Sequence, residues 1–230
     1  MPVTSKRGVT PELVVPLVVR SQARGTLDEV SWSRVPAVAL RRAQDGGFPV
    51  QATAVRVAHD ADALLLRFDC DDRDVWATHT RRDAPLWEEE VVELFVAPGE
   101  DDPSEYFEIE VNPLGVIFDA RVVSPKGQRD SMRVDAGWNA AGLVTAIEHP
   151  SPGSWAASLV IPWGDLCVGA PPRVWRANFF RIDRPRSGDH EFSCWSPTLA
   201  DPPDFHRPAF FGRLVLDGVG ADARCVREKG

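Results

Sequence analysis

The feature that most constrains this fold is a strict two-residue alternation in two nearby stretches, 91–96 and 106–112. Successive side chains of a β-strand point to opposite faces, so the alternation predicts two strands with one apolar face each. The acidic loop between them favours an antiparallel pair. The predicted core face carries Val92, Leu94, Val96, Phe107, Ile109 and Val111.

The opposite face of this hairpin collects polar side chains near Trp87. They are Glu93, Glu108, Glu110 and Asn112, with Phe95 and Tyr106 between them. Three carboxylates and an amide on one sheet face predict a ligand-binding surface. The alternative is a solvated face, because antiparallel sheets commonly expose one side to water. The alternation alone does not decide between the two.

Other stretches extend the β pattern along the whole chain. Polar turns containing Gly, Pro and Asp separate them, and a short helical turn is expected at 161–166. With no internal repeat or long helix, the pattern predicts an all-β antiparallel sandwich of jelly-roll type. The further predicted strands are 13–19, 53–58, 63–70, 115–123, 142–148, 155–161, 176–183 and 212–216.

The boundaries of the pattern predict one domain over residues 10–217. Residues 1–9 are expected to be a loose tail, and residues 218–230 a polar tail. No stretch has the apolar core of a signal peptide or the roughly 18 apolar residues of a membrane span. The protein is therefore expected in the cytoplasm, or outside the cell if a leader precedes this sequence.

The net charge limits the kinds of binding partner that are expected. The formal net charge is −8, which argues against binding to a nucleic-acid backbone or an anionic membrane. A neutral or cationic ligand suits it better. The hydrophobic and charged fractions of 43% and 26% are ordinary for a globular protein. The sequence gives no indication of oligomeric state.

Cysteine and aspartate positions bear on metal binding. The four cysteines stand far apart without a CxxC pair, so a zinc site is not expected. Cys70 and Cys167 lie in apolar runs and are predicted to be buried thiols, although a disulfide is left open. Asp71, Asp72 and Asp74 could together bind calcium. A solvated loop that needs no metal is the favoured interpretation, and no cofactor is required.

Arg181 lies on a predicted strand next to the hairpin, and alternation places it on the same face as Asp183. We expect its guanidinium to neutralise one of the hairpin carboxylates. It therefore joins the predicted ligand-binding residues.

The order of motifs along the chain resembles the family 9 carbohydrate-binding modules, within the wider group of DOMON-like β-sandwiches. The matching motifs are GTLDEVSW, DADALLLRFDCDD, LWEEEVVELFV, YFEIEVNPLG, WAASLVIPWGDL, WRANFFRID and CWSPTLADPPDFHRPAFFGRL. Together they cover nearly the whole predicted domain in family order.

The resemblance implies a particular site. In sugar-binding members two tryptophans hold a terminal sugar ring, and polar side chains on the concave sheet bind its hydroxyls. Trp87 matches one tryptophan and Glu93 the strand carboxylate, while Glu108, Glu110 and Asn112 match other sheet positions. Phe205 stands where the second tryptophan would be, and Glu110 where a member can carry arginine. Both departures put glucose-type specificity in doubt. The family can also bind structural calcium.

The resulting functional prediction is a stand-alone, non-catalytic carbohydrate-binding protein whose ligand is a mono- or oligosaccharide. Three alternatives stay open: a glycoside hydrolase using two of the carboxylates, an accessory protein of carbohydrate catabolism, and a degenerate module that binds protein. A haem or redox module is also conceivable. It would need axial ligands that two methionines and five scattered histidines do not suggest.

Overall fold

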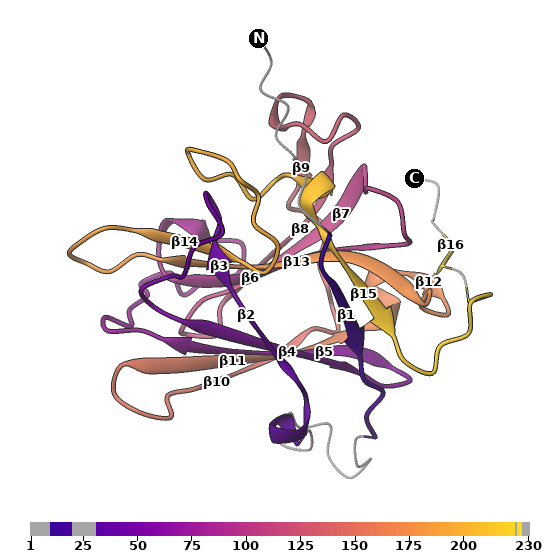
Figure 1. The fold of residues 1–230 in the computed structure, drawn as a ribbon, viewed down its shortest axis with the longest axis horizontal. Coiled ribbons are helices and arrows are strands. Elements are labelled where there is room, and N and C mark those ends of the chain that lie inside the picture. The colour runs from indigo at the N-terminus through magenta and orange to yellow at the C-terminus, as the bar shows by residue number, and fades with distance from the viewer. Residues whose placement is uncertain (1–9, 20–30, 224, 227–230) are drawn as a thin grey trace.

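Strand alternation produces a two-layer β-sandwich in the computed structural model (Figure 1), so the predicted all-β sandwich is confirmed. The structure describes residues 10–19, 31–223 and 225–226. The predicted tail at 1–9 and most of the GTLDEVSW motif lie outside these residues.

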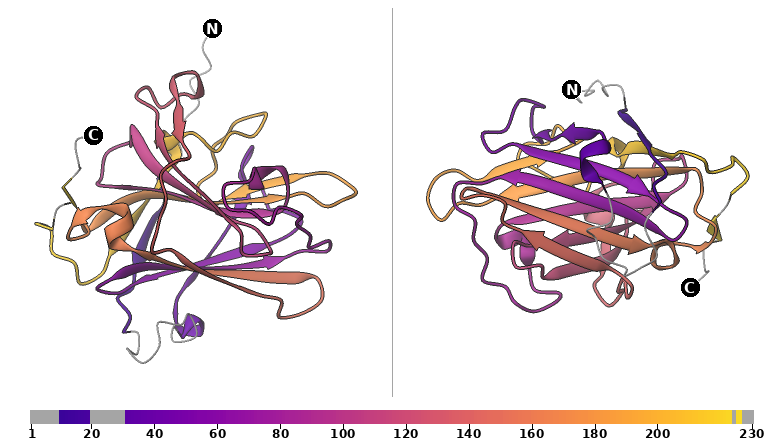
Figure 2. Two further views of the ribbon diagram at one scale, coloured as in Figure 1. Left: turned by 180° about the vertical axis from the view of Figure 1, so that it is seen from behind. Right: turned by 90° about the horizontal axis from the view of Figure 1, so that it is seen from below.

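The larger sheet has nine strands, and the smaller sheet has five. In Figure 1 the smaller sheet lies below the larger one, and it faces the viewer in the right-hand panel of Figure 2. Along its main path the larger sheet runs β1 (Glu12–Val15), β15 (Gly212–Leu216), β13 (Val174–Asp183), β6 (Val91–Pro98), β7 (Glu105–Val111), β8 (Ile117–Val123) and β9 (Arg133–Asp135), with β14 (Glu191–Cys194) and β3 (Arg41–Arg42) branching from β13. The smaller sheet runs β10 (Val144–Glu148), β11 (Ser154–Pro162), β5 (Ala63–Asp71), β4 (Thr53–His59) and β2 (Ala37–Ala39).

Short elements complete the chain. The pair β1–β15 is parallel, whereas the strands of the central hairpin are antiparallel. A two-stranded sheet joins β12 (Val168–Gly169) to β16 (Cys225–Val226). In the described part of the chain, the helical turns are α1 (Trp163–Leu166), which is α-helical, and the 3-10 turns η2 (Trp32–Arg34), η3 (Leu86–Glu88), η4 (Arg129–Ser131) and η5 (Pro208–Phe210).

The main core fills the space between the two sheets. Val92, Leu94 and Ile109 from the central hairpin are buried there, as the alternation predicts. The ring of Phe68 on β5 meets the ring of Phe179 on β13 edge to face, with centroids 6.3 Å apart. Apolar area buried from both layers holds the sandwich together.

A second core covers the other face of the larger sheet. It contains Phe95, Tyr106, Phe180 and Phe211, each at most 1% exposed. Loops provide the cover: Figure 1 shows the chain between β14 and β15, and the chain around β9, rising from this face. The solvated-face alternative is therefore wrong, because loops distant in sequence bury this side of the sheet.

The segment between β14 and β15, residues 195–211, will be called the roof segment. Asn178 on β13 holds its beginning: the Asn178 side chain accepts a hydrogen bond from Ser196 N–H (2.9 Å) and donates one to Ser196 C=O (2.8 Å). The ring of Trp195 lies against Gly212, where an added Cβ would come within 2.2 Å of it. The roof segment is thus fixed to the sheet at its start and its end.

The predicted buried thiols are confirmed. Cys70 and Cys167 are free and only 2% and 8% exposed. Burial raises the pKa of each thiol to about 12.

Candidate functional site

A pocket of about 370 Å³ lies on the loop-covered face of the larger sheet. Its base consists of Glu93, Glu108 and Glu110, which together will be called the acidic floor. Aromatic side chains form most of its walls, and they are Trp87, Phe95, Phe118, Phe192 and Phe205. This volume falls in the range typical of sites for small molecules.

Strand register explains how the acidic floor is placed. Glu93 on β6 lies directly opposite Glu110 on β7. The next residues outward in the same row across the sheet are Phe180 on β13 and Phe118 on β8. Opposed residues in neighbouring strands have Cβ atoms about 4.5–5.5 Å apart. Two carboxylates therefore face each other with a phenyl ring on either side.

Trp87 and Phe205 stand at the two ends of this row. Trp87, on η3, packs edge to face against Phe118 with centroids 5.1 Å apart. Phe205, in the roof segment, stacks on Phe180 at 4.3 Å. Trp87 is 42% exposed and Phe205 only 8%. The row thus has an aromatic wall at each end and carboxylates between them.

The acidic floor is buried and electrostatically costly. Glu93, Glu108 and Glu110 are at most 5% exposed, and one oxygen of each lies within 4.8 Å of one oxygen of the others. Burial raises the pKa of Glu93 and of Glu110 well above the ordinary range, and the neighbouring carboxylates raise both further. Burial raises the pKa of Glu108 to about 7. These groups hold protons that an exposed glutamate would release.

Three basic residues line the pocket that sequence reasoning did not find: Arg129, Arg184 and His206. The Nδ1 atom of His206 lies 2.8 Å from the Tyr106 hydroxyl, and its Nε2 lies 3.9 Å from Glu108. Burial lowers the pKa of His206 to about 4, so its ring is neutral near pH 7. The only sequence signal for His206 is its place beside Phe205.

Asn112 follows β7 and does not line the pocket. Its side-chain oxygen accepts hydrogen bonds from the N–H groups of Leu114 and Val116, both at 3.0 Å. Its NH₂ group donates to the carbonyl of His79 at 3.0 Å. This amide thus holds together the β7–β8 turn and the loop between β5 and η3, which contains His79. It was predicted to be a ligand-binding group instead.

Replacing Asn112 with alanine is expected to lower the free energy of unfolding by about 1–3 kcal/mol, because buried backbone groups lose their partners. Urea denaturation would measure this. Asn139, which is exposed, provides a control, and its replacement by alanine should change stability by less than about 0.5 kcal/mol. An Asn112→Ala protein as stable as the parent would contradict the structural role.

Arg181 lies on the opposite face of the larger sheet from the acidic floor, so the prediction that it neutralises a hairpin carboxylate is wrong. Its Nη1 donates to Thr53 Oγ1 at 3.1 Å and to the Asp71 carbonyl at 2.6 Å. Its register partner is Val92, which faces the main core. Arg181 and Asp183 do share a face, as predicted, with Nη2 and Oδ1 3.7 Å apart.

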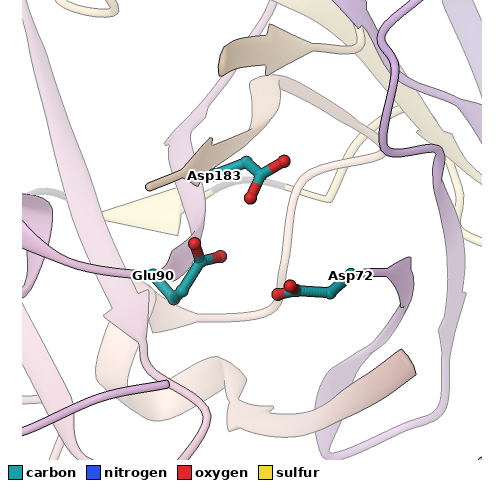
Figure 3. Close-up of side chains that lie close together, drawn as sticks. All are labelled: Asp72, Glu90 and Asp183. Atoms are coloured by element: carbon teal, nitrogen blue, oxygen red, sulfur yellow. The ribbon is translucent and has the colours of Figure 1, made fainter. Parts of the chain in front are cut away.

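Three carboxylates surround Arg181, and together with it they will be called the Arg181 cluster. Figure 3 shows Asp72, Glu90 and Asp183 converging from separate segments. The Nη2 atom of Arg181 lies 3.1 Å from Asp72 and 3.7 Å from each of the other two. Burial raises the pKa of Glu90 to about 9.

The predicted calcium ligands are not brought together. Asp71 is exposed, and Asp74 is held by the backbone and side chain of Arg186. Only Asp72 joins a carboxylate group, where it also accepts a hydrogen bond from Trp155 Nε1 at 3.1 Å. Because the Arg181 guanidinium supplies the cationic charge there, this group does not fit the predicted calcium site.

The fold and the pocket define a class: a β-sandwich with a pocket of small-molecule size on the outer face of one sheet. The family model for carbohydrate-binding family 9 matches residues 22–216, and the chain belongs to this family. A relative from Arthroderma benhamiae, described as an extracellular protein, is 28% identical over 179 residues. These residues make up 73% of this chain and 80% of the relative.

Solved structures share the fold. A protein of Bacteroides uniformis, described as a candidate carbohydrate-binding protein, has a TM-score of 0.75 at 21% identity and matches 90% of this chain and 100% of its own. A family 9 module of Caldicellulosiruptor kristjanssonii, solved with cellotriose, has a TM-score of 0.62 at 14% identity. That match covers 93% of this chain and 98% of the module.

Among the described residues, no helix is long and apolar enough to cross a membrane.

Proposed function

We propose that this protein is a non-catalytic carbohydrate-binding protein that holds a sugar between aromatic walls over the acidic floor. One observation carries the proposal: Trp87 and Phe205 stand at the two ends of a row whose centre is Glu93 and Glu110. Family membership supports carbohydrate as the ligand class. The extracellular description of the Arthroderma relative favours the secreted alternative over the cytoplasmic one.

The chemistry of this pocket suits a sugar ring. Sugar C–H groups pack against aromatic faces, while hydroxyl groups need polar partners at fixed positions. Protonated carboxyl groups both donate and accept hydrogen bonds, so the acidic floor offers partners of both kinds to sugar hydroxyls. Since Trp87 is the more exposed of the two end aromatics, we expect it to contribute the largest share of ring contact.

The placement of the carboxyl groups favours binding over hydrolysis. Glycoside hydrolases place their two carboxyl groups on either side of the scissile bond. In the acidic floor, Glu93 and Glu110 stand side by side on one sheet face, and Glu108 gathers with them. The proposed role is therefore recognition, with all three carboxyl groups on one side of the ligand.

Calorimetric titration with neutral and amino mono- and oligosaccharides, including glucose and cellotriose, tests the proposal. We expect saturable binding by the wild-type protein, and we expect Trp87→Ala to weaken it at least about tenfold, or 1.4 kcal/mol. The ring contact is lost while the acidic floor stays in place.

Trp138 provides a matched control. It is also partly exposed, but it stacks on Phe107 at 4.5 Å and lines a different cavity. Trp138→Ala should bind sugar as the wild type does. Absence of binding across the panel, or equal affinity in the Trp87→Ala protein, would refute the proposed site.

A further inference from the structure

Two groups of three buried carboxylates occur among the described residues. They differ in whether a cationic side chain lies among the carboxylates. The Arg181 cluster contains its own cation. In the acidic floor, Glu93 Oε1 and Glu110 Oε2 have no hydrogen-bond partner, although both residues are at least 98% buried. Unpaired buried polar atoms of this kind are costly. Both residues line the pocket, so a ligand there is placed to supply the missing partners.

The basic residues around the pocket do not pair with the carboxyl groups of the acidic floor. Arg129 Nε lies 3.3 Å from Asp204, and Arg184 Nη1 lies 3.0 Å from His190. Within the described chain, neither arginine forms an ion pair with the acidic floor. His206 is neutral near pH 7, as described above. Ionisation of the acidic floor would therefore need a positive charge that the ligand supplies.

The wall chemistry distinguishes an organic cation from a metal ion. Calcium takes 6–8 oxygen ligands. Apart from the acidic floor, the side chains that line this pocket are aromatic, aliphatic, arginine or histidine, and none offers an oxygen. Aromatic walls contribute contact with a ring instead. The pocket thus combines a ring-binding surface with buried carboxyl groups that an organic cation would ionise.

We propose that this pocket selects a sugar carrying a protonated primary amine, an amino sugar such as glucosamine, with its ammonium group on the acidic floor. The inference rests on the proposed carbohydrate binding and names the class of sugar. The ammonium donates to Glu93 and Glu110, while the ring lies against Trp87 and Phe205. A neutral sugar brings no positive charge, so the carboxyl groups of the acidic floor stay protonated beside it.

Proton exchange provides an independent signature. Because Glu93, Glu108 and Glu110 hold protons in the free pocket, an ammonium group brought among them lowers the pKa of each and drives protons off. The other titratable or charged groups facing this space are His206, Arg129 and Arg184. His206 is already neutral and the arginines stay charged, so released protons come from the acidic floor. Affinity for the amine therefore rises with pH until the amine itself deprotonates.

The test is calorimetry of the intact protein with glucosamine, glucose and N-acetylglucosamine near neutral pH, with and without a chelator. N-acetylglucosamine has the same ring but a neutral nitrogen. We expect glucosamine to bind at least tenfold more tightly than either neutral sugar. Repeating the titration in buffers of different ionisation enthalpy should show proton release for glucosamine alone.

Glutamate-to-glutamine substitutions test whether the preference for glucosamine arises at the acidic floor. Glu110→Gln keeps the side-chain shape and should bring the ratio of glucosamine to glucose affinity close to one. Glu93→Gln provides a second variant if the first does not fold. Glu100→Gln, at an exposed glutamate, should leave the ratio as in the wild type.

Three results would overturn the inference. Equal affinity for glucose and glucosamine removes the amine preference but keeps the proposed carbohydrate binding. Calcium binding that Glu110→Gln abolishes, without any preference for the amine, assigns the acidic floor to a metal. Failure of every sugar to bind removes the proposed function as well.

Discussion

Replacing Arg181 with methionine is expected to lower the free energy of unfolding by about 3–5 kcal/mol, because removing one partner of a buried ionic group leaves uncompensated charge. The side chains of Arg181, Asp72 and Glu90 are at most 1% exposed. The guanidinium also links the two sheets through Thr53 and the Asp71 carbonyl. Methionine preserves much of the volume but none of the five N–H donors.

Urea denaturation of the wild-type and Arg181→Met proteins measures this loss. Arg42→Met is the matched control, since Arg42 pairs with Asp45 at 2.6 Å but the two side chains are 45% and 54% exposed. A surface pair of this kind contributes about 0–1 kcal/mol. If the two variants lost equal stability, the Arg181 cluster would not be the cross-sheet anchor described here.

The second large effect is a fall in stability as pH rises. Above the ordinary glutamate pKa of about 4.3, the unfolded chain releases the protons of Glu93, Glu108 and Glu110. The native protein keeps them because their pKa values are raised. The native state then binds more protons than the unfolded state, so the free energy of unfolding decreases with pH. The decrease ends where pH passes the raised native pKa of each group, near 7 for Glu108.

The double variant Glu93→Gln, Glu110→Gln isolates this effect. Its stability should be closest to that of the wild type near pH 4 and should exceed it by an increasing amount up to pH 8, by up to about 1.4 kcal/mol for each unit of pKa elevation removed. Other groups with raised pKa values, such as Glu90 and Asp183, contribute equally to the pH dependence of both proteins. Their contributions therefore cancel in the difference in stability. Unfolding curves measured across this pH range provide the comparison. Parallel pH profiles for the two proteins would rule out buried, proton-holding carboxyls at this face.

Alternation predicted the face shared by the acidic floor because a β-strand has a fixed period of two. It could not predict that this face is buried. The cover comes from the roof segment, about 90 residues later in the chain, and no local pattern reports such a contact. Phe205 was found through family resemblance, whereas its neighbour His206 carried no pattern at all.

The strand β13 shows why Arg181 was assigned to the wrong face. All ten of its residues are buried, so neither face of the strand is marked by exposed polar positions. Alternation fixed the partnership of Arg181 with Asp183 but gave no basis for choosing between the two cores. The face on which Arg181 lies follows from its register with Val92, and only the three-dimensional structure provides this register.

The aspartates at the end of β5 and just after it, Asp71, Asp72 and Asp74, illustrate a different limit. Three acidic residues close in sequence suggested one metal site. The chain leaves the strand at this point, and its backbone sends the three side chains in different directions. Asp72 turns inward because it accepts hydrogen bonds from Trp155 and from the Asp74 N–H. The carboxylates that do converge with it, Glu90 and Asp183, come from elsewhere in the chain.

The anchoring of the roof segment has a consequence for binding energetics. Asn178 and the contact between Trp195 and Gly212 fix both ends of this segment during folding. Part of the conformational entropy of its backbone is therefore lost during folding, so less remains to be lost when a ligand binds. Substitutions between these two anchors can reshape the pocket wall and alter specificity while the sheet beneath keeps its packing.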